Sequence, residues 1–170
     1  MKELKLSNTE RRALVDDEDL ERCRRYIWHK AKTDYSISIL TNYDDGTSIS
    51  LARFILGDFE ADVIDHKDRN PFNNLKSNLR PATFQQNLRN QGIRKDNKTG
   101  FKGVHLRKNR KGEIAGYIAQ ININGKSKHL GIFDTPEQAA RRYDKAAKHI
   151  FGEFAFLNFP DEEVKKEDIQ

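Results

Sequence analysis

The residues best suited to catalysis lie in one stretch, Asp65 to Asn90, where carboxylate, imidazole and amide side chains are closely spaced. Asp65 and His66 directly follow the apolar pair Val63–Ile64. We therefore expect a strand whose tip carries a carboxylate and an imidazole. Carboxylate oxygens are ligands that a hard divalent cation prefers, and a neutral imidazole can take a proton from water. Together these groups suit the hydrolysis of a phosphodiester.

A short helix is predicted just downstream of this strand. Thr83 and Gln86 form a capping-box pattern, which places Asn87 in the first turns of the helix. Asp65 and Asn87 would hold one divalent cation, Mg²⁺ first and Mn²⁺ as the alternative, with water and phosphate as the other ligands. His66 points to the opposite side of an extended backbone, so it would serve as a general base.

Asn78 lies in the Asn-rich loop between the strand and the helix. Its amide oxygen could accept a hydrogen bond from the His66 ring and fix the tautomer of that base. Asn-rich loops are also common turn chemistry, because Asn bonds its own backbone. An isolated Asp-His pair is therefore weak evidence, whereas the whole spaced string is specific.

The string Asp65-His66, then Asn78-Leu79-Arg80 and then Asn87 on a helix, resembles the HNH (ββα-metal) nucleases, particularly their phage and intron homing-endonuclease branch. The resemblance implies metal binding by Asp65 and Asn87, a general base at His66 and an orienting role for Asn78. Many members of that family carry histidine at the last position, where this chain has Asn87. The function implied is a homing-type endonuclease that nicks DNA.

Positive charge is concentrated in the later part of the chain, whose net formal charge is +5 over 170 residues. Residues 1–64 carry ten Lys or Arg and thirteen Asp or Glu, net −3, and residues 65–93 carry five and two, net +3. Residues 94–160 carry fourteen and six, net +8, and residues 161–170 carry two and five, net −3. We expect a polyanion to bind the basic part, and the resemblance to nucleases implies that it is double-stranded DNA. A merely solvated basic face is the alternative.

The order of the elements predicts an α+β protein whose nuclease domain spans residues 1–92, with its motif at 63–90. Short strands, hairpins and helices should precede the motif. Acidic residues 16–19 come before apolar positions that are spaced for one helical face. These positions are Leu20, Cys23, Ile27 and Trp28.

A polar, glycine-bounded stretch at 93–100 is typical of a linker. Its Arg94, Lys95 and Lys98 would follow the DNA backbone. Residues 161–170 are expected to form a charged tail.

Residues 101–160 predict a three-stranded antiparallel sheet packed on one helix. Asn124-Gly125 is a strong hairpin signal between two strands of alternating apolar residues. Thr135 and Gln138 flank Pro136 in the pattern of a helix start. The predicted apolar face of this helix consists of Ala139, Ala140, Tyr143, Ala146, Ala147 and Ile150.

Four short strings in this segment, Lys102–Val104, Tyr117–Ile121, Leu130–Phe133 and Asn158–Phe159, resemble the DNA-binding domain of the plant ethylene-response factors (APETALA type). The resemblance implies that the sheet lies in the major groove of duplex DNA. The contact positions of that family fall on His105, Arg107, Tyr117 and His129.

Within this expected interface, Arg107 could read guanine with two hydrogen bonds. Lys126 and Lys128 would hold phosphates. His105 and His129 can equally be exposed strand positions without a ligand.

Other classes of protein are disfavoured by what the sequence lacks. Cys23 is the only cysteine, so neither a disulfide framework nor a cysteine-based zinc site is expected. Neither a secretory signal, nor a membrane-spanning apolar run, nor a Gly-rich nucleotide loop is found, so neither a membrane nor a nucleotide cofactor is expected. We expect a monomer or weak dimer in the cytoplasm of a bacterial or phage-infected cell. A non-catalytic DNA-binding regulator is the alternative function.

Overall fold

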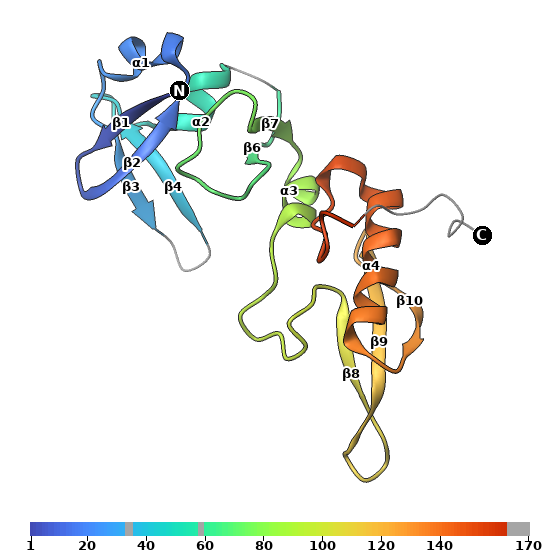
Figure 1. Cartoon of the computed structure of the whole chain (residues 1–170). Coiled ribbons are helices and arrows are strands. Elements are labelled where there is room, and N and C mark those ends of the chain that lie inside the picture. Colours follow the sequence, from blue (N-terminus) through green and yellow to red (C-terminus); the bar gives the residue numbers. More distant parts are fainter. Residues whose placement is uncertain (33–35, 58–59, 163–170) are drawn as a thin grey trace. The chain divides into compact units, whose positions relative to one another are not determined.

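The computed structural model describes residues 1–32, 36–57 and 60–162, which form helices and antiparallel sheets (Figure 1). The predicted α+β class is confirmed. The chain divides into two compact units, Met1–Leu88 and Arg89–Gln170. We call them the N-terminal unit and the C-terminal unit.

The N-terminal unit contains three small sheets and short helices. The sheets are the hairpin β1-β2, the three-stranded sheet β3-β4-β5 and the pair β6-β7. In chain order the elements are β1 (Lys2–Leu6), β2 (Thr9–Val15), α1 (Asp17–Cys23), β3 (His29–Lys32), β4 (Ile37–Asn42), β5 (Ser48–Ser50), α2 (Leu51–Leu56), β6 (Val63–His66), β7 (Leu79–Ala82) and α3 (Phe84–Asn90).

The helix predicted from residues 16–19 onward is shorter than its apolar spacing suggests. It ends at Cys23, and Trp28 enters the core by a turn instead, where its indole Nε1 donates to the carbonyl of Cys23 (2.8 Å). Trp28 packs edge-on against Tyr26 and Phe54. Ile27 is 76% exposed, so its place on a buried helical face was wrongly predicted.

The C-terminal unit is the predicted three-stranded sheet with one long helix. Its elements are β8 (Val104–Lys108), β9 (Ile114–Ile123), β10 (Lys126–Phe133), α4 (Pro136–Phe151) and the 3₁₀ turn η1 (Gly152–Phe154). The strand order is β10-β9-β8. Asn124 and Gly125 both have positive φ, +51° and +79°, as the predicted two-residue hairpin turn requires.

Helix α4 begins with the predicted capping box. The Thr135 side chain accepts from the Gln138 N–H, and the Gln138 side chain accepts from the Thr135 N–H. Its buried face contains the predicted alanines and Tyr143, which lie against β9. Ile150 was wrongly predicted to be on this face: it is 37% exposed, and Phe151 is buried in its place.

The stretch 93–100, predicted as a linker, forms a folded loop within the C-terminal unit. The Asn97 carboxamide oxygen accepts from the N–H groups of Thr99 and Gly100, and its nitrogen donates to the Phe101 carbonyl. The Thr99 hydroxyl also donates to the Phe101 and Val104 carbonyls, so side-chain to backbone bonds fold the loop back on itself.

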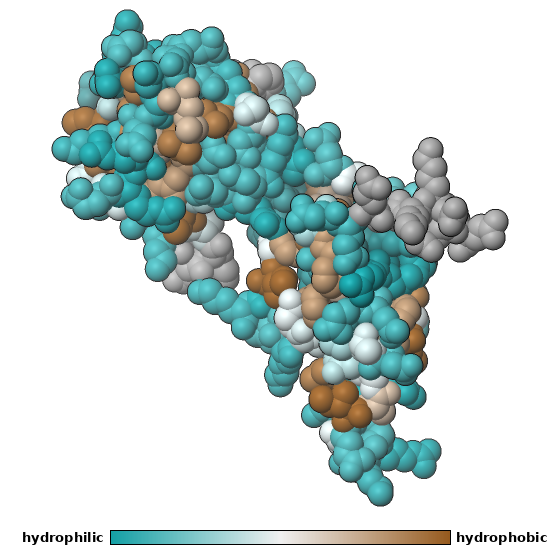
Figure 2. All heavy atoms as spheres, viewed as in Figure 1, coloured by the Kyte–Doolittle hydropathy of each residue, from teal (hydrophilic) through white to brown (hydrophobic). Residues whose placement is uncertain are grey.

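On the face that Figure 2 shows, hydrophilic residues predominate and hydrophobic residues gather in small groups. Among the described residues, no helix is long and apolar enough to cross a membrane.

Candidate active site and nucleic-acid interface

The catalytic stretch adopts the predicted order of strand, loop, strand and helix. β6 pairs with β7, so that Asp65 is opposite Arg80 and His66 is opposite Leu79. Helix α3 follows after Thr83, which forms the predicted capping box with Gln86. The N–H of Phe84 donates to Asp62 Oδ2 (3.1 Å), which fixes the start of the helix next to β6.

Asp65 is buried (3% exposed) and forms an ion pair with Arg80 from the opposite strand. The guanidinium donates through Nε (2.9 Å) and Nη2 (2.7 Å), both to Asp65 Oδ2. These two charge-assisted hydrogen bonds fix the orientation of the carboxylate. The sequence pattern includes Arg80 in the Asn-Leu-Arg string, but its contact with Asp65 follows only from the strand register.

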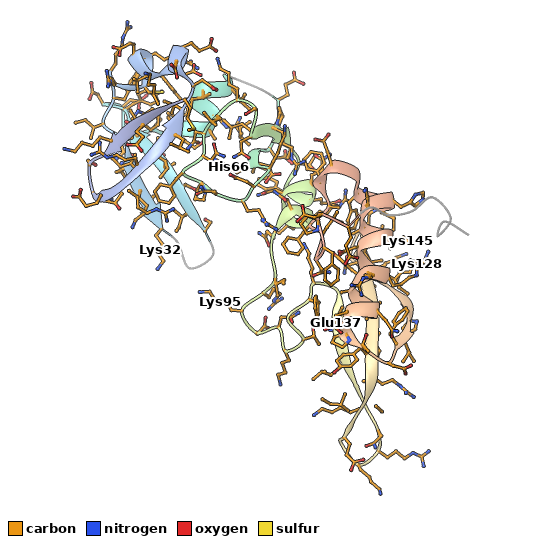
Figure 3. The ribbon with its side chains drawn as sticks, in the orientation of Figure 1. Lys32, His66, Lys95, Lys128, Glu137 and Lys145 are labelled. Atoms are coloured by element: carbon orange, nitrogen blue, oxygen red, sulfur yellow. The ribbon has the colours of Figure 1, made fainter. Side chains whose placement is uncertain are left out.

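His66, labelled in Figure 3, lies at the end of β6. Asn74 holds its ring. Its ring Nε2 lies 3.2 Å from the Asn74 carboxamide oxygen, and the Asn74 nitrogen donates to the Pro71 carbonyl (2.9 Å). Because that second bond fixes the amide, the Asn74 oxygen accepts and His66 Nε2 carries the proton. Burial lowers the pKa of His66 below its ordinary value of 6.5, so the imidazole is neutral at pH 7.

Asn78, the predicted partner of His66, has a different position in the loop. Its amide nitrogen donates to Asp68 Oδ1 (2.9 Å) and to the Asn73 carbonyl (2.8 Å), and its oxygen accepts from the Asp68 N–H (3.1 Å). The predicted contact of Asn78 with the ring is thus replaced by one from Asn74. The loop turns back between Asn74 and Asn78, and the spacing of the sequence does not reveal this turn.

The loop that carries Asn74 is fixed by the first hairpin and by α1. The Leu14 N–H donates to the Phe72 carbonyl (2.7 Å), and the Asn74 N–H donates to the Leu14 carbonyl (2.9 Å). The Lys76 N–H donates to Asp16 Oδ2 (2.8 Å), which explains why Asp16 does not cap α1 with its side chain. These early residues therefore brace the site, a function that local sequence signals did not predict.

Asn87 lies on α3 and is half-buried. Its backbone N–H donates to the Thr83 carbonyl. None of the described residues forms a hydrogen bond with its side chain. Within that part of the chain, no group of three His, Cys, Asp or Glu side chains could hold a metal ion. The oxygen donors of Asp65 and Asn87 still fit a hard cation that keeps most of its water and binds phosphate.

The second predicted interface is the sheet of the C-terminal unit, whose two faces differ. α4 covers the face with Val104, Ala119 and Ile121. Residues directly opposite in an antiparallel pair share a face. The other face, which we call the open face, is formed by His105, Arg107, Ile118, Gln120, Asn122, Ser127, His129 and Ile132.

Three predicted contact residues lie on the side of α4. Tyr117, predicted as a DNA contact, packs against the apolar cluster under the helix. Lys128 is opposite Ile121 and Lys126 is opposite Ile123, which places both lysines on the α4 side of the edge strand β10. His105, Arg107 and His129 remain on the open face.

The predicted backbone contacts Arg94, Lys95 and Lys98 are exposed on the folded 93–100 loop. Arg94 pairs with Asp96 through Nε (3.0 Å). A groove of the C-terminal unit is lined by Arg94, Lys98 and His105, so cations of the loop lie along the same groove as a residue of the open face.

β6, the Asn-rich loop, β7 and α3 form a strand–loop–strand–helix unit that carries Asp65, His66 and Asn87. An uncharacterized HNH endonuclease of Acanthamoeba polyphaga mimivirus is 38% identical to the chain over 140 residues, 79% of this chain and 67% of that protein. The chain belongs to the HNH endonuclease family.

A second relative matches less of the chain. An ethylene-responsive transcription factor of Arabidopsis thaliana is 32% identical over 87 residues, 51% of this chain and 19% of that protein. No family model matches the chain, and no solved structure matches it.

Proposed function

We propose that this protein is a divalent-metal-dependent DNA endonuclease that nicks duplex DNA through His66. The observation that carries the proposal is the neutral, Asn74-held imidazole next to the Asp65 carboxylate, in a chain of the HNH endonuclease family. Asp65 and His66 both lie on β6, which supports a single active site in each chain.

His66 acts as the general base in this mechanism. Since Nε2 donates to Asn74, the lone pair that takes a proton from the attacking water is on Nδ1. The burial that lowers the pKa of the ring also keeps the imidazole in its neutral, basic form at pH 7. Asn74 then stabilises the imidazolium that forms, because its oxygen remains bonded to the Nε2 proton.

Asp65 and Asn87 would hold the divalent cation, with Mg²⁺ or Mn²⁺ as the hard ions that suit their oxygen donors. When bound, such a cation supplies Lewis-acid stabilisation of the charge on the scissile phosphate and leaving oxygen. Arg80 orients Asp65 by its two bonds to Oδ2.

The C-terminal unit would supply most of the affinity for duplex DNA. Residues 94–160 carry a net charge of +8, and β8, β9 and β10 contain no Asp or Glu. The partial likeness to the ethylene-responsive transcription factor supports binding of DNA by the sheet. We propose that the open face, with Arg107, enters the major groove.

The test is cleavage of supercoiled plasmid with Mg²⁺ or Mn²⁺, beside an EDTA control. His66→Ala should abolish conversion to open circles while its affinity for DNA stays within about twofold. His149→Ala, which removes an exposed histidine of α4, is the matched control and should cut like the wild type. Linear product would indicate that two active sites cooperate.

A non-catalytic DNA-binding regulator is the second candidate, favoured by the likeness to a transcription factor. Retarded but uncut plasmid with both metals over a range of salt would establish it. Failure to bind DNA at low salt would contradict both functions.

A further inference from the structure

The open face has an apolar centre. Ile118 on β9 and Ile132 on β10 are directly opposite each other, on the side that α4 does not cover. Ile132 is 50% exposed, and among the described residues neither isoleucine belongs to the two apolar clusters under α4. His105 on β8 is opposite Ile118 on its other side. Two branched apolar side chains on neighbouring strands therefore offer one small contact surface.

Polar side chains lie on both sides of this pair. One step along the sheet, Gln120 is opposite His129, and its Nε2 donates to Ser127 Oγ (2.8 Å). In the other direction Arg107 is exposed on β8, where its Nη1 donates to the Ala115 carbonyl (3.3 Å). The surface thus combines hydrogen-bonding groups with an apolar centre and carries no acidic side chain from the three strands.

We propose that Ile118 and Ile132 contact the 5-methyl groups of thymine in the major groove, and thereby make the C-terminal unit select thymine-containing sites. The inference rests on the proposed DNA binding by the open face. Among the groups that the base edges present in the major groove, the thymine methyl is the apolar one. Gln120, His129 and Arg107 are placed to bond the neighbouring base edges or phosphates.

The size and charge of the face favour DNA over a protein partner. Apolar patches that bind proteins usually cover a few hundred Å² or more. Two isoleucine side chains among histidine, arginine and glutamine are much smaller than that. The excess of cations in the same unit is complementary to a polyanion.

The experiment uses the full chain carrying His66→Ala, in EDTA, so that bound DNA is not cut. Duplexes are selected from a random library, and the selected sequences are made again with deoxyuridine in place of thymidine. This exchange removes the methyl group and leaves every hydrogen-bonding group of the base. Loss of one buried methyl contact should raise Kd about fourfold, and loss of two about fifteenfold.

Two variants test whether the isoleucines cause the difference in Kd between thymidine and deoxyuridine duplexes. The double variant Ile118→Ala, Ile132→Ala should bind thymidine and deoxyuridine duplexes with equal affinity. Ile132→Val retains a branched side chain and should keep most of the wild-type ratio of the two Kd values, deoxyuridine over thymidine. Ile150→Ala removes a 37% exposed isoleucine on α4 and should leave the ratio unchanged. A cross-strand pair also stabilises the sheet, so thermal unfolding checks that each variant is folded.

Equal affinity of the parent protein for both duplexes would overturn the inference, as would an unchanged ratio in the folded double variant. Duplexes with 5-methyldeoxycytidine in place of deoxycytidine test the other source of the same methyl group. Tight binding that needs methylated cytosine and is indifferent to thymine would overturn the assignment to thymine. Selection of no duplex at all would overturn the proposed DNA binding and this inference with it.

Discussion

At the residue scale, two asparagines of one loop, Asn74 and Asn78, bind different partners. Asn74 is 1% exposed and orients the His66 ring, while Asn78 ties Asp68 and Asn73 together. Both differ from a simple turn residue, because each side chain uses both its oxygen and its nitrogen. Cleavage should therefore depend directly on Asn74.

Asn74→Ala should reduce kcat for plasmid nicking about ten- to a hundredfold, because the His66 tautomer is no longer fixed. The dissociation constant for DNA in EDTA should not change. Asn70→Ala, in the same loop, is the control: it removes only an acceptor for the Phe72 N–H (3.2 Å). A wild-type kcat in folded Asn74→Ala would show that this contact does not orient the base.

Cys23 provides a pH-dependent prediction at the same scale. It is fully buried, and burial raises the pKa of its thiol from 9.0 to about 11. The unfolded chain loses this proton first, so the free energy of unfolding should fall as the pH rises from about 9 to about 11. The expected loss is up to about 2 kcal/mol.

Urea unfolding followed by the fluorescence of Trp28, the single tryptophan, measures this effect. Cys23→Ala should lack this contribution, so its stability should change less over the same window. Identical pH profiles of the two proteins would contradict the buried-thiol account.

At the scale of elements, the packing of the C-terminal unit depends on the close approach of α4 to the sheet. Gly103, just before β8, has φ +76°, and a Cβ there would lie 1.9 Å from the Tyr143 ring. The ring is 4% exposed and belongs to the apolar cluster under α4. Only glycine leaves room for this contact.

Gly103→Ala should destabilise the C-terminal unit by several kcal/mol, because the backbone is strained and the Tyr143 ring must move. Gly112→Ala is the matched control: it also has a positive φ, +83°, but nothing lies within 4 Å of its Cβ. It should cost only about 1–2 kcal/mol. Thermal unfolding followed by circular dichroism compares the two, and equal losses would refute the steric explanation.

At the scale of the whole molecule, the residues proposed for cutting DNA and those proposed for holding it come from different units. His66 is in the N-terminal unit and the open face is in the C-terminal unit. Variants of the two sites should therefore change different measured quantities.

Arg107→Ala should raise the Kd for DNA about tenfold or more and reduce the slope of log K against log salt, while kcat at saturating DNA remains unchanged. Lys128→Ala removes an exposed cation of the same sheet on the α4 side and should have a smaller effect. Fluorescence anisotropy in EDTA at several salt concentrations measures both. A larger effect of Lys128 would mean that the α4 side, and not the open face, contacts DNA.

The sequence by itself determined the features that depend on local patterns. The Asp-His tip of β6, the capping boxes of α3 and α4 and the Asn124-Gly125 turn were predicted because neighbouring residues decide them. The α+β class followed from the same signals, since hydrophobic periodicity reports which side of an element is buried.

Only the tertiary structure decided which side chains meet. The Asp65–Arg80 pair depends on strand register, and the contact of Asn74 with His66 depends on a loop that is fixed by Leu14, some sixty residues earlier. Register likewise placed Tyr117 and Lys128 on the side of α4 and left His129 on the open face. These contacts join residues far apart in the chain, and so their energies are set by packing and long-range hydrogen bonds that no local pattern encodes.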